Sequence, residues 1–202
     1  MAGAKQGKTK AMSEGSADGA GSARLEAMLS GFRPAPVGRW NPPNCGTIDI
    51  RIDRDAVWHH EGARIERPAL VRLFASVLRR EVDGSYVLVT PHEKLAITVD
   101  DAPFLAVDCV LDERHAPSRL VFATNLGEAV CLDGDHPLRI EGGAAGEAFI
   151  PYLTVRPGLE ARLTRSLAAE LAGRAVLRQG VLGVESAGHF FVIGSADMAT
   201  EA

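Results

Sequence analysis

Two Arg-Pro pairs, Arg67-Pro68 and Arg156-Pro157, offer the plainest binding chemistry in the sequence. Each pair is predicted to open a helix, because proline suits the first helical position, where an N–H would have no partner. The first turn of a helix has unpaired N–H groups and partial positive charge, which attract phosphate or carboxylate. With the arginine side chains as bidentate donors, the two openings predict a shared anion-binding groove, and Trp58 or Tyr152 is the candidate stacking surface for a base.

The alternative is that these arginines are ordinary surface residues. Arginine supplies 18 of the 22 basic residues, a bias that a GC-rich genome would produce. Lys94 stands out because it is the one lysine beyond the first ten residues, and it follows Glu93 at a predicted turn. Glu93, Lys94 and Asp101 are candidates to line the same groove, although an exposed turn pair explains the first two equally well.

Other reactive side chains give weaker signals. His59, His60 and Glu61 resemble a metal-binding triplet, but neighbouring residues of a strand point to opposite faces, which argues against a shared ion. Cys109 falls in a predicted strand and Ser76 in a predicted helix, so packing is the better interpretation of both than nucleophilic catalysis. No cofactor is indicated by any motif.

Composition excludes several classes of protein. The 202 residues carry a formal net charge of −4, so no chain-wide positive field attracts nucleic acid. The three cysteines, Cys45, Cys109 and Cys131, form no Cys-x-x-Cys pair, which argues against zinc ribbons and disulfide frameworks. No signal-peptide core or run of eighteen apolar residues is present, so we expect a cytoplasmic protein with no membrane insertion.

The best-defined local elements are a helix, a turn and a strand in direct succession. Apolar residues spaced as on one helical face predict a helix that begins at Pro68; they are Leu70, Val71, Phe74, Val77 and Leu78. Asp83-Gly84 breaks the pattern, and Tyr86 to Val89 reads as a buried strand. Period-2 alternation predicts further strands at Thr47 to Ile52 and Leu95 to Val99.

The C-terminal part is predicted to contain short strands and a second helix. Leucines at every fourth position indicate that this helix runs from Arg156 to Gly173; they are Leu159, Leu163, Leu167 and Leu171. A hairpin around Ser186-Ala187-Gly188 then closes the chain. Shifting the first half by 89 residues places Arg67-Pro68 over Arg156-Pro157, which suggests an internal duplication.

These elements predict an α+β protein with two related tandem units, each a small, mainly antiparallel sheet packed on one helix. Residues 1–24 are predicted to be a disordered tail, because they contain little that could be buried, and Gly7-Lys8-Thr9 lacks the earlier glycine of a phosphate loop. The N-terminal unit is expected at 25–115 and the C-terminal unit at 116–202, divided in the polar stretch Arg114 to Ser118.

Several uncommon short motifs occur in the same order as in a bacterial family catalogued as domain of unknown function 1285, which this sequence resembles. The likeness covers about Pro42 to Ile193, and His60 departs from it where an aromatic residue is expected. The residues and motifs that carry the resemblance are Trp58, Gly62, Ile65, Arg67-Pro68, Leu70-Val71, Leu73-Phe74, Asp83-Gly84, Tyr86, Leu88-Val89-Thr90-Pro91, Glu93-Lys94, Asp101-Ala102-Pro103-Phe104 and Gly158-Leu159-Glu160-Ala161-Arg162.

This resemblance implies a duplicated core, a C-terminal half superficially like a pleckstrin-homology domain, a nucleotide-like ligand between the halves and a role in signal transduction. It implies no particular enzymatic reaction. We therefore expect a regulatory protein that binds a small anionic ligand through Arg67, Arg156, Trp58, Tyr152, Glu93 and Lys94. One alternative is an enzyme that uses Glu93, Asp101 or His59 as acid or base. Another is a protein-interaction module with exposed sheet edges.

Overall fold

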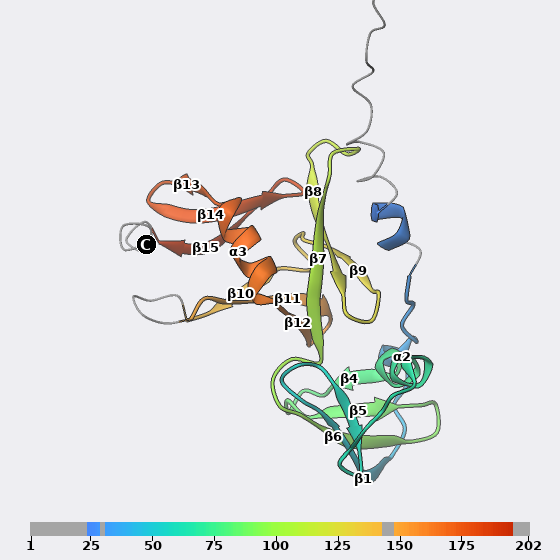
Figure 1. Ribbon diagram of the computed structural model, residues 1–202. Helices are drawn as coiled ribbons and strands as arrows, with labels where there is room; N and C mark the ends of the chain where they lie inside the picture. The colour runs from blue at the N-terminus through green and yellow to red at the C-terminus, as the bar shows by residue number, and fades with distance from the viewer. Residues whose placement is uncertain (1–23, 29–30, 143–147, 196–202) are drawn as a thin grey trace, which may run out of the picture.

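The computed structural model describes residues 24–28, 31–142 and 148–195 and shows two tandem, sheet-dominated domains with few helices (Figure 1). Apart from Arg24, the predicted tail lies outside the described residues, as does Gly7-Lys8-Thr9. A short helix occupies 24–28, and no helix in the described part of the chain is long and apolar enough to cross a membrane.

The first sheet has six strands in the order β3-β2-β1-β6-β5-β4. β1 and β6 run parallel, and every other neighbouring pair is antiparallel. In β1 the predicted alternation is confirmed, since Ile50 and Ile52 are buried and Arg51 is exposed. The elements are η1 (Val37–Arg39), β1 (Asn44–Ile52), β2 (Trp58–His60), β3 (Ala63–Arg64), α2 (Pro68–Ser76), β4 (Leu78–Arg80), β5 (Tyr86–Val89) and β6 (Lys94–Val99).

The second sheet also has six strands, in the order β10-β11-β12-β7-β8-β9. β12 and β7 run parallel, and the other pairs are antiparallel. The predicted division at Arg114 to Ser118 falls in the turn of the long β7–β8 hairpin, whose two strands both belong to this sheet (Figure 1). Its strands are β7 (Phe104–Asp112), β8 (Arg119–Thr124), β9 (Ala129–Cys131), β10 (Leu138–Glu141), β11 (Ile150–Arg156) and β12 (Leu159–Leu163).

A helix and a small antiparallel sheet complete the described chain. Helix α3 (Arg165–Gly173) contacts β7 and β11, and Thr164 caps its N-terminus by accepting a hydrogen bond from the Leu167 N–H. The third sheet has the order β13-β14-β15 and contains the predicted C-terminal hairpin. Its strands are β13 (Val176–Arg178), β14 (Val181–Ser186) and β15 (His189–Ser195).

The two six-stranded sheets share one topology. When the strands of each sheet are numbered from 1 to 6 along the chain, both sheets read 3-2-1-6-5-4, with the parallel pair between the first and sixth strands. The matching first strands, β1 and β7, begin at Asn44 and Phe104. The repeated unit therefore aligns the two sheets near a shift of 60 residues, and the predicted shift of 89 is wrong because it places helix α2 over strand β12.

The helix predicted to begin at Arg156-Pro157 is also wrong. Arg156 ends β11, and Pro157-Gly158 forms the two-residue turn into β12, where Gly158 adopts φ +74°. A spacing of four residues is even, so it keeps side chains on one face of a strand as well as on one face of a helix. Leu159 and Leu163 are accordingly buried on β12, whereas Leu167 and Leu171 are buried on α3.

One apolar core runs through both domains. It joins Ile52 and Trp58 of the first sheet to Phe104 and Leu153 of the second, and it extends to Val184 of the third. The two six-stranded sheets are therefore packed as one body, and the grooves between them are bounded by fixed walls.

Candidate functional site

A groove of about 340 Å³ lies between the two domains, at the N-terminal end of α2. We call it the α2 groove and define it by Trp58, Arg64, Arg72, Leu105, Asn125 and Leu126. Trp58, Arg64 and Arg72 come from the first domain, and the other three come from β7 and the turn that follows β8. Its volume is within the range of small-molecule sites, and its lining combines charged side chains with apolar ones.

Two arginines, Arg64 and Arg72, line this groove, and a third, Arg67, lies beside it. Arg67 is the N-cap of α2, Arg64 lies three residues before it, and Arg72 lies one helical turn into α2. All three are exposed, and their guanidinium groups make no ion pair or hydrogen bond with any described residue. Glu66 is the one carboxylate beside them that is likewise unpaired within the described chain. The opening therefore presents excess positive charge next to the positive end of a helix.

Trp58 is among the residues that line this groove. The residue is 2% exposed, and its ring stacks on Phe74 of α2 with centroids 6.2 Å apart. The Nε1–H is buried and has no hydrogen-bond acceptor among the described residues. A buried donor without an acceptor costs free energy, which a ligand oxygen or ring nitrogen at this position would recover. Because Phe74 covers one ring face and only 2% of the residue is exposed, Trp58 offers little surface for stacking on a base.

Arg156 lies at the opposite end of α2 from Arg67. Its Nη2 donates a hydrogen bond of 3.1 Å to the carbonyl oxygen of Ala75, in the last turn of α2. Its Nε lies 3.3 Å from Glu128 Oε1, and both side chains are nearly buried. Burial raises the pKa of Glu128 and lowers that of Arg156. The structure therefore does not bring the two predicted arginines together, and Arg156 joins the domains.

Tyr152 also joins the domains. Its hydroxyl donates a 2.9 Å hydrogen bond to Asp101 Oδ1, and the guanidinium carbon of Arg139 lies 4.1 Å from the centre of its ring. Burial and the bond to Asp101 raise the pKa of Tyr152 to about 12. Asp101 is further paired with Arg162 Nε at 3.2 Å. The hydrogen bond thus occupies both Tyr152, on β11, and Asp101, in the segment that links β6 to β7.

Glu93 and Lys94 lie where the β5–β6 turn of the first domain meets β6. Glu93 is exposed in the turn before β6, where its N–H bonds the hydroxyl of Thr90. Lys94 Nζ lies 3.6 Å from Glu81, which also accepts a hydrogen bond from Arg79. Neither residue lines the α2 groove.

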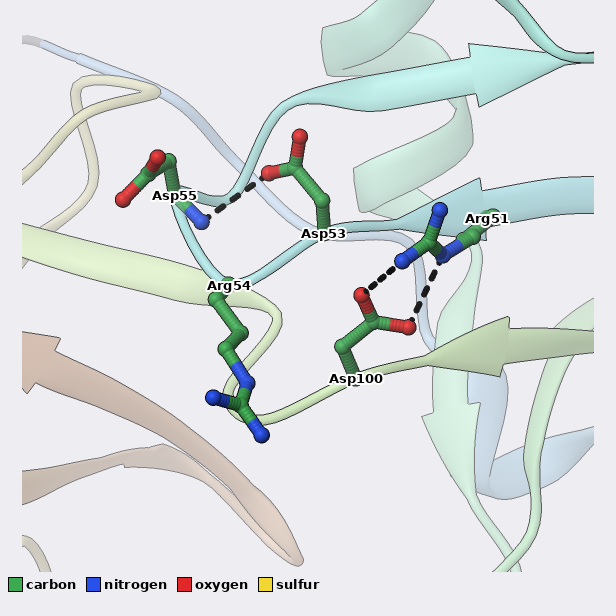
Figure 2. A pocket seen from close by; sticks show the side chains of 5 residues that line it. All are labelled: Arg51, Asp53, Arg54, Asp55 and Asp100. Atoms are coloured by element: carbon green, nitrogen blue, oxygen red, sulfur yellow. Dashed lines mark hydrogen bonds and ion pairs between the residues drawn. The ribbon is translucent and has the colours of Figure 1, made fainter.

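A second, more open pocket of about 570 Å³ is lined by Arg51, Asp53, Arg54, Asp55 and Asp100 (Figure 2). Its charges are largely satisfied by one another, because Arg51 forms a bidentate pair with Asp100 at 2.9 and 2.5 Å. These bonds lower the pKa of Asp100. Asp53 accepts hydrogen bonds from the Asp55 N–H and from His59 Nε2. Figure 2 shows the Arg54 side chain turned away from Arg51 and Asp100. This pocket therefore offers few free groups to a ligand.

Sequence reasoning found one defining residue of the α2 groove, Trp58, together with Arg67 beside it, and missed the other five: Arg64, Arg72, Leu105, Asn125 and Leu126. Arg64 and Arg72 carried a usable signal, because they flank Arg67 at spacings that bring them to one end of the helix. Leu105 and Asn125 carried none, since they belong to the second domain and reach the groove only through tertiary packing.

The fold and this site define a two-domain protein with a groove between its domains, and comparison with known proteins identifies the family. The model for "Domain of unknown function (DUF1285), N-terminal domain" matches residues 35–102, and the model for the C-terminal domain of the same family matches 103–193. The chain belongs to the DUF1285 family. No functionally curated protein matches it.

Two solved structures are similar to this chain. A DUF1285 family protein from Silicibacter pomeroyi DSS-3 is 39% identical, with 87% of this chain and 96% of that chain covered and a TM-score of 0.77. A DUF1285 family protein from Shewanella baltica OS155 is 26% identical, with 61% and 90% covered and a TM-score of 0.48.

Proposed function

We propose that this protein is a regulatory ligand-binding protein that holds a small anionic, nucleotide-like molecule in the α2 groove. The observation that carries the proposal is that two unpaired guanidinium groups, those of Arg64 and Arg72, line the groove, and that a third, that of Arg67, lies at the N-cap of α2 beside it. Ten of the chain's other arginines make ion pairs with described carboxylates, whereas Arg64, Arg67 and Arg72 make none within the described chain.

The groove complements both ends of such a ligand. Guanidinium groups and the N-terminus of α2 suit a phosphate, because both present N–H donors and positive charge. The apolar side chains of Leu105 and Leu126 suit a base, and the Trp58 Nε1–H, which has no acceptor in the described structure, suits a ring nitrogen or carbonyl acceptor.

A regulatory role fits the position of the groove. Because Arg72 belongs to the first domain and Leu105 and Asn125 to the second, a bound molecule would contact both and stabilise their packing. Ligand binding would then be transmitted as a change in the stability of the whole body. Signal transduction, a cytoplasmic location and a pleckstrin-like C-terminal half are parts of the same proposal. The shared strand order of the two sheets supports an origin by duplication.

A thermal-shift screen tests the proposal. Adenosine 5′-monophosphate, guanosine 5′-monophosphate, adenosine and inorganic phosphate would each be added to the full-length protein. A ligand at about 100 times its Kd adds about 2.7 kcal/mol to the free energy of unfolding, so a nucleotide should raise Tm by several degrees. Adenosine, which lacks the phosphate, should raise it much less. No shift with either nucleotide would contradict the proposal.

A further inference from the structure

A second groove, of about 400 Å³, lies at the other end of α2. We call it the β4 groove. Its walls are formed by Pro36 and Val37 of the segment before β1, by Leu78 of β4, and by Leu159 of β12. It is therefore also bounded by both domains. No aromatic ring and no carboxylate lines it within the described chain.

The polar groups that line the β4 groove are all arginines. Arg79 is occupied, because it bonds Glu81 and the carbonyl oxygens of Val37 and Trp40. Arg80 is exposed and makes no ion pair with a described carboxylate; its Nε donates to the carbonyl oxygen of Gly84 at 3.3 Å. The groove therefore has one guanidinium available at its surface.

Arg156 supplies a second guanidinium with spare donors. Its Nε and Nη1 are buried without a hydrogen-bond partner in the described structure, although Nε lies 3.3 Å from Glu128 Oε1. Five N–H donors surround a guanidinium, and unpaired donors in an apolar setting cost free energy. An anionic oxygen placed between Arg80 and Arg156 would accept hydrogen bonds from both guanidinium groups.

We propose that the β4 groove is a separate binding site for a small amphipathic anion, an aliphatic chain that ends in a carboxylate. The aliphatic walls at Pro36, Val37, Leu78 and Leu159 take the chain, and Arg80 and Arg156 take the carboxylate. An aromatic ligand is disfavoured because no ring lines the groove to stack on it. The site does not depend on the α2 groove.

Gly38 provides a sharp test because it lines the β4 groove, and a Cβ built on it meets no atom within 4 Å. Gly38→Leu should therefore fill the groove without disturbing the fold. Gly173, at the end of α3, has the same open surroundings, so Gly173→Leu is the matched control. Unchanged Tm values of the two variants would confirm that both fold.

Isothermal titration with octanoate is the measurement. We expect one octanoate per chain, affinity reduced at least about tenfold in Gly38→Leu, and no change in Gly173→Leu. Arg80→Gln tests the site without a change at Gly38, and it should weaken octanoate binding. The uncharged 1-octanol should bind to the wild type more weakly than octanoate does. The proposal is overturned by undetectable octanoate binding, by equal affinity in Gly38→Leu, or by equal affinities for octanoate and octanol.

Discussion

The side chain of Arg156, at the end of β11, donates a 3.1 Å hydrogen bond to the carbonyl oxygen of Ala75 in α2 and lies against the carboxylate of Glu128. One arginine thus connects a helix of the first domain to two segments of the second. Phe104 packs beside it, with its ring centre 5.0 Å from the guanidinium carbon. The packing of the domains on each other, and hence the shape of both grooves, depends on this contact.

Removal of Arg156 alone should be costly. In Arg156→Met the Glu128 carboxylate stays buried without its cation, so the free energy of unfolding should fall by about 3–5 kcal/mol in urea titrations. The double variant Arg156→Met/Glu128→Leu removes both charges and should be more stable than the single variant. A double variant that is as unstable as Arg156→Met would show that the ion pair is not what the single substitution breaks.

Asp112 should make stability depend on pH in acid. Its buried carboxylate is held by Arg114 and Arg119, whose hydrogen bonds lower its pKa against the opposing effect of burial. Because the pKa of Asp112 is lower in the folded state, its charge stabilises the protein at pH values above about 3.9, the pKa of the unfolded state. This stabilisation is lost as the pH falls towards the pKa of the folded state. Asp112→Asn should therefore lower the free energy of unfolding at pH 7 by about 1.5–3 kcal/mol.

The difference in the free energy of unfolding between wild type and Asp112→Asn should narrow below about pH 4. Urea unfolding at pH 7, 5, 3 and 2 measures it. Glu113→Gln is the control, because Glu113 is the exposed neighbour and should have little effect. A difference that stays the same at every pH would argue against a role for the Asp112 charge.

The three free cysteines should differ in reactivity. Cys45 is exposed, whereas Cys109 is 6% exposed and burial raises its pKa to about 12. Because the thiolate is the reactive form, a disulfide reagent at pH 8 should modify Cys45 at least about a hundredfold faster than Cys109. Cys45→Ser should remove the fast phase of the modification reaction, and unfolding in urea should make Cys109 react quickly. Cys131 is partly exposed, so a fast phase that survives in the double variant Cys45→Ser/Cys131→Ser would contradict the burial of Cys109.

Local patterns predicted the first domain well. The turn residues Asp83-Gly84 and the β-branched run after them place β5 at Tyr86–Val89, as predicted. Pro68 begins α2 as expected, but the helix ends at Ser76 and Leu78 is in β4. The apolar spacing could not show this end, because Leu78 is buried in either conformation.

The elements of the second domain were harder to predict, because its leucine spacing fits both the period of a helix and that of a strand. Leu159 and Leu163 satisfy the period of a strand as well as that of a helix. The Pro157-Gly158 turn was the signal that should have decided between them. The groove residues from the second domain could not be predicted, since Leu105 and Asn125 reach Trp58 only when the two sheets pack together.

The central claim is that the unpaired arginines of the α2 groove bind an anion. Isothermal titration of adenosine 5′-monophosphate into wild type, Arg67→Ala, Arg72→Ala and the control Arg174→Ala tests it most directly; Arg174 is bonded to Glu170 on α3 and lines neither groove. We predict one nucleotide per chain, affinity lowered about tenfold or more in Arg67→Ala and in Arg72→Ala, and no change in Arg174→Ala. Equal affinity in all four proteins, or no binding to the wild type, would contradict the claim.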